Sequence, residues 1–97
     1  MPSSKEYLNY CLEQLRTLDN ITFKRMMGEF LLYYEGVLFG GIYDDRLLVK
    51  KTETNKNYNM EEQNPYTGAK NMYLVSDIDD ISTLKEIVLD TVKGLKK

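Results

Sequence analysis

The chain has 97 residues, which is the size of one domain. It carries 13 Lys and Arg against 15 Asp and Glu, so its formal net charge is −2, and direct nucleic-acid binding driven by phosphate contacts is not expected. Hydrophobic residues make up 42% and charged residues 29%, a composition typical of a globular rather than a disordered chain.

The residue types that the sequence lacks exclude several kinds of chemistry. There is no histidine, so the chain can form neither a Ser-His-Asp triad nor an imidazole zinc site. A single cysteine excludes an intrachain disulfide, and no apolar run approaches the ~20 residues of a membrane span. The first six residues contain no apolar signal core. We therefore expect a cytoplasmic protein that is not an enzyme, without metal or membrane contact.

The first predicted element is a helix over about residues 4–18. Ser3 and Glu6 stand at the spacing of a capping box. The helix carries one apolar stripe at helical spacing, formed by Leu8, Cys11, Leu12, Leu15 and Leu18. Its place on this stripe favours a buried core thiol at Cys11 over a reactive one.

A three-stranded antiparallel meander is predicted next, after a short strand at 21–23. Two-residue turns at Glu35-Gly36 and Asp44-Asp45 separate its strands, which we expect at 30–34, 37–43 and 47–51. Gly40-Gly41 lies inside the second strand. This pair indicates a bulge that bends the sheet, or else a close approach of a ligand or a second backbone.

Both faces of this meander are apolar. Strand side chains alternate between the two faces, so Leu31 and Tyr33 point one way while Phe30 and Leu32 point the other. A sheet with one wet face would carry polar residues at every second position, and this one does not. We expect the second face to be covered by the protein's own helices, by a twin subunit or by a bound apolar ligand.

The C-terminal part predicts three further elements: a short helix at 53–63, a fourth strand at 71–76 and a closing helix at 80–96. Asn64-Pro65 ends the first of them. The predicted order is therefore α-β-β-β-α-β-α. This order is typical of an α+β domain in which N-terminal and C-terminal helices pack on an antiparallel sheet.

The start of the closing helix is rich in polar residues. Thr83 and Glu86 stand at capping-box spacing. Asp77, Asp79 and Asp80 lack the glycine and the final glutamate of a calcium loop, so we interpret them as capping and first-turn charge.

A series of short motifs runs along the chain. In order these are Lys24-Arg25-Met26-Met27-Gly28, Glu35-Gly36-Val37-x-Phe39-Gly40, Ile42-x-Asp44-Asp45-Arg46-Leu47, Val49-Lys50, Pro65-Tyr66 and Met72-Tyr73-x-Val75. Taken together they resemble the TfoX N-terminal domain family over about residues 5–95, and the chain is similar to stand-alone members of that family. A full-length member regulates natural competence in some bacteria together with an activator of the cyclic-AMP receptor type. The resemblance implies a regulatory role, with neither enzyme activity nor a cofactor.

We therefore expect a non-catalytic regulatory or protein-interaction domain that spans residues 1–97. It would act through its second sheet face, as a homodimer or with another protein such as a transcription regulator. The alternative is a small-ligand sensor with Arg25 and Lys50 as polar contacts. The candidate binding residues are Arg25, Met26, Gly28, Tyr33, Phe39, Asp44 and Lys50.

Two of these candidates have a plainer interpretation as well. Arg25 offers a fork for an anion or an acidic partner, but it also fits a surface charge paired with Asp44 or Asp45. Tyr33 belongs to a set of strand tyrosines that would stack on bases or simply pack in the core or an interface, namely Tyr33, Tyr34, Tyr43 and Tyr73.

Overall fold

The computed structural model describes residues 4–76 and 78–96. These residues form one antiparallel sheet of six strands and two α-helices, which confirms the predicted α+β class. The helices are α1 (Lys5–Gln14) and α2 (Ile81–Leu95), and a short 3₁₀ helix, η1, spans Lys56–Tyr58. The strands are β1 (Ile21–Met26), β2 (Glu29–Tyr34), β3 (Val37–Ile42), β4 (Leu47–Val49), β5 (Glu61–Gln63) and β6 (Met72–Leu74), arranged in the order β1-β2-β3-β4-β6-β5.

Three two-residue turns set the register of the first four strands. Both residues of each turn have a positive φ, as at Glu35 (50°) and Gly36 (82°), and this backbone matches the right-handed twist of the flanking strands. The turns predicted at Glu35-Gly36 and Asp44-Asp45 are confirmed. The remaining turn, Met27-Gly28, joins β1 to β2. Because β1 pairs with β2 up to Met26, it is longer than the predicted strand at 21–23.

The glycine pair in β3 lies at a bulge, as predicted. Leu32 of β2 pairs with Gly40, while the next residue, Tyr33, pairs with Leu38, so Phe39 is the extra residue. The space beside Gly40 is also taken by a second backbone, since a Cβ there would lie 2.9 Å from the Cα of Val49 in β4. Glycine is therefore required where β3 and β4 approach each other.

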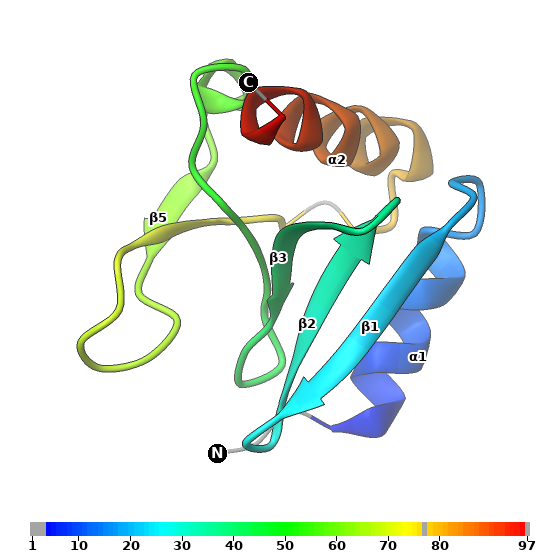
Figure 1. The fold of residues 1–97 in the computed structure, drawn as a ribbon, viewed down its shortest axis with the longest axis vertical. Helices are drawn as coiled ribbons and strands as arrows, with labels where there is room; N and C mark the ends of the chain where they lie inside the picture. Colours follow the sequence, from blue (N-terminus) through cyan, green and yellow to red (C-terminus); the bar gives the residue numbers. More distant parts are fainter. Residues whose placement is uncertain (1–3, 77, 97) are drawn as a thin grey trace.

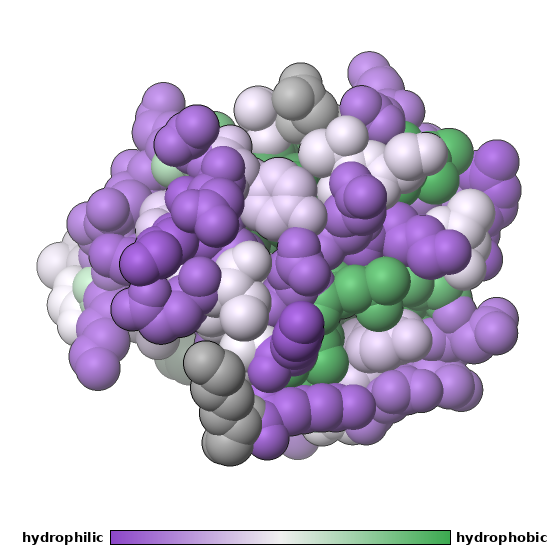
Figure 2. Space-filling model, turned by 90° about the horizontal axis from the view of Figure 1, so that it is seen from above, coloured by the Kyte–Doolittle hydropathy of each residue, from purple (hydrophilic) through white to green (hydrophobic). Residues whose placement is uncertain are grey.

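Both helices pack on the same face of the sheet. Figure 1 shows α1 behind β1, and α2 above the upper ends of β2 and β3. The main core joins α1 (Leu8, Cys11, Leu15), α2 (Leu84, Ile87, Val88, Val92) and the sheet (Phe30, Leu32, Phe39, Ile42, Leu47, Val49). The outward side of α2 is mostly hydrophilic, as the view from above shows (Figure 2).

Each helix begins at a residue whose side chain accepts a backbone hydrogen bond. The hydroxyl of Ser4 accepts one from the Tyr7 N–H at 3.1 Å; the predicted cap, Ser3, lies outside the described residues. The carboxylate of Asp80 accepts one from the Thr83 N–H at 3.2 Å. This hydrogen bond holds the pKa of Asp80 below its ordinary value. The predicted capping box at Thr83 and Glu86 is therefore wrong, because the better acceptor, a carboxylate, stands three residues before Thr83.

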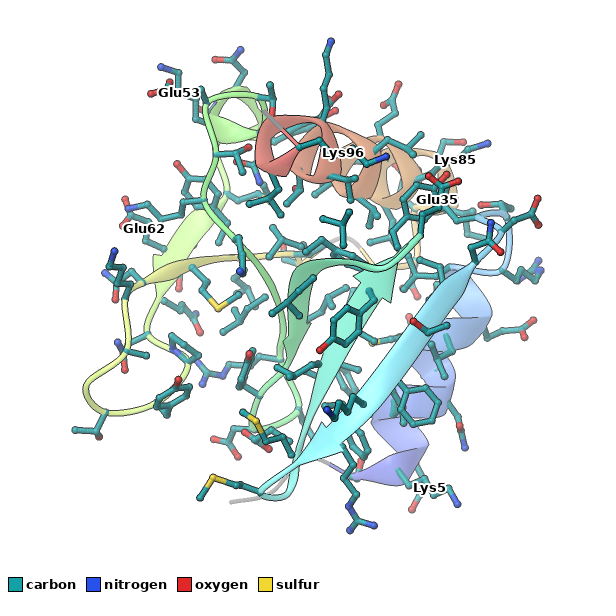
Figure 3. The ribbon with its side chains drawn as sticks, viewed as in Figure 1. Lys5, Glu35, Glu53, Glu62, Lys85 and Lys96 are labelled. Atoms are coloured by element: carbon teal, nitrogen blue, oxygen red, sulfur yellow. The ribbon has the colours of Figure 1, made fainter. Side chains whose placement is uncertain are left out.

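The end of α2 is tied to the sheet by an ion pair. The ammonium of Lys96 lies 3.6 Å from the carboxylate of Glu35 in the turn between β2 and β3, and both side chains are about half exposed. Figure 3 shows the two side chains reaching toward each other above the sheet. Surface pairs of this kind contribute little to stability.

The helix predicted at 53–63 is wrong. The segment forms η1 and then β5, which pairs with β6. Asn59 has a left-handed backbone with φ 56°, which ends η1 after one turn. At the start of the segment the side chain of Asn55 bonds to the backbone at Lys50 and Thr52, an alternative that competes with helix formation.

Asn55 also ties this segment to α2. It is fully buried, and its side-chain amide donates to the carbonyl of Lys50 at 2.8 Å and to the hydroxyl of Thr91 at 2.7 Å. Its side-chain carbonyl accepts from the Thr52 N–H at 3.0 Å. Buried polar groups that are all satisfied in this way fix one arrangement of the chain, and here they fix the path of the residues that follow β4.

Candidate functional site

The sheet face opposite the helices, here called the second face, carries its own small apolar cluster. Tyr43, Leu48 and Met72 are buried there, with Leu31 and Leu74 half-buried against them. Within the described chain no residue of α1 or α2 joins this cluster. Of the three predicted covers, the protein's own helices therefore do not cover this cluster within the described residues.

A loop covers part of the second face in their place. The guanidinium of Arg46 donates to the Gln63 side chain at 2.7 Å and to the carbonyls of Asn64 at 3.3 Å and Pro65 at 3.4 Å. These bonds hold the loop at 64–71, between β5 and β6, beside the sheet. The ring of Tyr66 then lies 6.1 Å from the ring of Tyr43.

A groove of about 850 Å³ lies between this loop and the sheet. Leu31, Leu38 and Met72 line its apolar floor, and Tyr66 lines it from the loop. Tyr66 remains 58% exposed and Met26, also on the lining, 45% exposed. Large apolar side chains that stay this accessible beside a groove are typical of a binding surface.

The polar lining of the groove is basic. Its described lining residues include Lys50, Lys51 and Lys70 and no Asp or Glu. Lys51 is paired with the Glu62 carboxylate at 2.8 Å, and this hydrogen bond raises its pKa. Lys50 and Lys70 take part in no ion pair within residues 4–76 and 78–96. A chain with a net charge of −2 thus presents a locally positive groove.

Three of the candidate binding residues predicted from the sequence lie on the second face. Met26 and Lys50 line the groove, and Tyr33 is half-buried on the same face, where it pairs with Leu38. Arg46 and Tyr66 were given no role from the sequence, although both stand within the motifs that indicated the family.

The other candidates lie elsewhere. Arg25 stands opposite Phe30, a core residue, so it projects from the helix-covered face and does not share the groove with Lys50. Phe39 is fully buried in the main core. Gly28 and Asp44 lie in turns, and the Asp44 N–H donates to the Glu29 carboxylate at 2.9 Å.

Cys11 and the four strand tyrosines occupy packing positions in the fold. Cys11 is fully buried, as predicted, and burial raises the pKa of its thiol to about 12. Tyr34 and Tyr73 pack against the main core, whereas Tyr33 and Tyr43 lie on the second face. Because the four tyrosines are divided between the two faces, they do not form one stacking platform.

Residues 4–76 and 78–96 hold neither a membrane-spanning helix nor a cluster of metal-ligating side chains. No helix among them is both long and apolar enough to span a bilayer. No group of three or more Cys, Asp or Glu side chains gathers there in a way that could hold a metal ion. Asp79 instead accepts a hydrogen bond from the Tyr10 hydroxyl, and Asp80 caps α2; Asp77 lies outside the described residues.

Comparison with known proteins finds similarity to a family and to a protein of another organism. The family model of the TfoX N-terminal domain matches residues 13–93, which include all six strands, most of α2 and only the end of α1. A protein of Spirochaeta aurantia, described as an uncharacterized 12.7 kDa protein in the trpE 5′ region, is 29% identical over 80 residues. That alignment covers 80% of this chain and 70% of the relative.

Proposed function

The chain belongs to the TfoX N-terminal domain family, and we propose that it is a regulatory protein-interaction domain that catalyses no reaction of its own. The observation that supports this function is the second face. Both helices pack on the other side of the sheet, which leaves a groove with an apolar floor and exposed Met26 and Tyr66 at its margin. Accessible apolar surface with a polar rim is a feature of protein-binding sites.

The proposed partner is another protein chain. A second copy of this chain is one possibility, because a small domain gains stability when an uncovered apolar face is buried in a dimer. A bacterial transcription regulator is the other, in keeping with the competence role known in the family. Light scattering after size exclusion separates the two, since a homodimer doubles the mass of the purified protein by itself.

Capture of partners by a tagged protein tests the function. We expect Tyr33→Glu to abolish capture from the source organism's lysate, because it places a charge on the half-buried second face. Leu89→Glu is the matched control: Leu89 is 36% exposed and lies on α2, which packs on the other face of the sheet. Capture that survives Tyr33→Glu in a folded variant, or is lost with Leu89→Glu alone, would contradict the proposal.

A small-ligand sensor is the second candidate function. Its support is the size of the groove, about 850 Å³, within the roughly 300–1,000 Å³ of small-molecule sites. A thermal-shift screen against metabolites and nucleotides tests it. A ligand that raises the melting temperature of the wild type but not of Leu38→Glu would favour the sensor, and a screen without any shift would count against it.

A further inference from the structure

We infer that the groove on the second face binds an acidic, partly apolar segment of a partner protein. This inference rests on the proposed protein-interaction function and names the chemistry of the partner. It combines three properties of the described residues: the course of the groove, the charge of its lining and the way its loop is held.

The course of the groove suits a stretch of polypeptide. Its lining includes Met26, at the end of β1, and Leu95, at the end of α2. Figure 1 places these two chain positions at opposite ends of the molecule, with β1 ending at the bottom and α2 ending at the top. A site that extends between them accommodates an elongated segment better than a compact metabolite.

The charge of the lining selects an acidic segment. Lys50 and Lys70 form no ion pair within the described residues, and Lys51 has one, with Glu62. Apolar side chains line the same groove, so a segment that carries both carboxylates and apolar side chains would match the surface. Charge complementarity of this kind contributes specificity and speeds association.

The same charge argues against a second copy in this groove. A two-fold dimer uses the same patch on both subunits, so face-to-face pairing would bring the lysine-bearing grooves of two copies together. Like charges brought together across an interface disfavour association. The partner segment is therefore expected to come from a different protein.

The hydrogen bonds that hold the groove's surroundings in place do not involve the side chains of Lys50 and Lys70. Arg46 fixes the 64–71 loop through the Gln63 side chain and the Asn64 and Pro65 carbonyls. The carbonyl of Lys50 accepts from buried Asn55, and its N–H donates to the Phe39 carbonyl at 2.9 Å. Because only backbone atoms of Lys50 take part, its side chain can be changed without loss of these contacts.

Selection from a random 12-residue peptide library displayed on phage tests the inference. On the wild type we expect enriched peptides to combine Asp or Glu with apolar residues. The double variant Lys50→Glu/Lys70→Glu should reverse this preference toward Lys and Arg. Lys85→Glu is the matched control, since Lys85 lies on α2 away from the groove, and it should select the same acidic peptides as the wild type (Figure 3).

Affinities measured with one enriched peptide, labelled with fluorescein, make the test quantitative. We expect the double variant to bind it about tenfold more weakly or worse, and added salt to weaken wild-type binding. A peptide in which Lys replaces each Asp and Glu should bind the double variant better than it binds the wild type. Such a rescue depends on charge and would not follow from a general loss of structure.

Three outcomes would overturn the inference. These are a library without enrichment, enrichment without acidic bias, and a concentration-dependent dimer that Lys50→Glu/Lys70→Glu strengthens. The proposed function fails separately: it fails when Tyr33→Glu leaves partner capture intact, whatever peptides the groove selects. A partner that is lost with Tyr33→Glu but kept by Lys50→Glu/Lys70→Glu would leave the function standing and refute the acidic segment.

Discussion

At the scale of single residues, Asn55 joins the groove side of the sheet to the helix side. It is fully buried, and its hydrogen bonds reach Lys50, Thr52 and Thr91. The sequence shows Asn55 only as one member of an Asn-rich stretch. Its role could not be predicted, because that role depends on a helix 36 residues away in the chain.

We predict that Asn55→Ala lowers the free energy of unfolding by about 2–3 kcal/mol, because it leaves the part-buried Thr52 N–H and Lys50 carbonyl without their partner. Urea denaturation followed by circular dichroism measures the change. Asn57→Ala, at an exposed position of the same segment, is the control and should stay within about 0.5 kcal/mol of the wild type. Equal effects of the two substitutions would contradict the role given to Asn55.

Cys11 provides a second residue-scale prediction, on pH. Burial raises its thiol pKa from 9.0 to about 12, so the folded state keeps the thiol neutral longer than the unfolded state does. The contribution to stability is fully present below pH 9 and is lost as the pH rises toward 12. The stability difference between the wild type and Cys11→Ala should therefore shrink over this range.

Denaturant unfolding at several alkaline pH values measures this difference. In the native protein at pH 8 we also expect iodoacetamide to leave Cys11 unmodified until urea unfolds the chain. Rapid alkylation without urea would show that the thiol is accessible and would refute its place in the core.

At the scale of elements, local patterns predicted most of the sheet and both terminal helices. Turn chemistry at Glu35-Gly36 and Asp44-Asp45 placed the hairpins, and apolar spacing placed α1 and α2. The error at 53–63 arose because the prediction of a polar helix there rested on composition alone. In the structure, the left-handed backbone of Asn59 ends η1, and pairing with β6 forms β5. Long-range contacts of this kind produce no periodic pattern in the sequence.

The candidate site was predictable only in part, for the same reason. An apolar second face followed from the alternation of side chains in β2 and β4. The boundary of the groove could not be predicted, because Tyr66 and Lys70 belong to a loop whose position depends on the hydrogen bonds of Arg46. The small-ligand alternative placed Arg25 and Lys50 in one site, but the register of β1 places Arg25 on the other face.

Arg46 supplies the prediction at this scale. Arg46→Lys keeps the charge but loses the fork that reaches Gln63, Asn64 and Pro65, so the 64–71 loop should become mobile while the rest of the fold persists. We expect faster hydrogen exchange at the Ala69 N–H, which donates to the Tyr66 carbonyl, and earlier proteolysis within the loop.

Arg16→Lys is the matched control, since Arg16 forms an exposed ion pair with Glu13, three residues before it, and makes none of the hydrogen bonds that hold the loop. It should leave exchange and proteolysis of the 64–71 loop unchanged. A loop that stays equally protected in Arg46→Lys would show that other contacts hold it.

At the scale of the whole molecule, the two faces of the sheet have different surroundings. Two helices bury one face in a single core, and outside them the surface is mostly hydrophilic, as in the view of α2 (Figure 2). The other face has a groove with an apolar floor, a basic lining and exposed Met26 and Tyr66. This asymmetry connects the fold to the proposed binding function.

The most direct measurement is photo-crosslinking in the living source organism. Benzoylphenylalanine placed at Tyr66, an exposed aromatic position on the groove, should crosslink the chain to one partner protein. The same probe at Leu89, on the outer side of α2, should give no such product. Crosslinks from Leu89 with none from Tyr66 would contradict the central claim that the second face is the interaction surface.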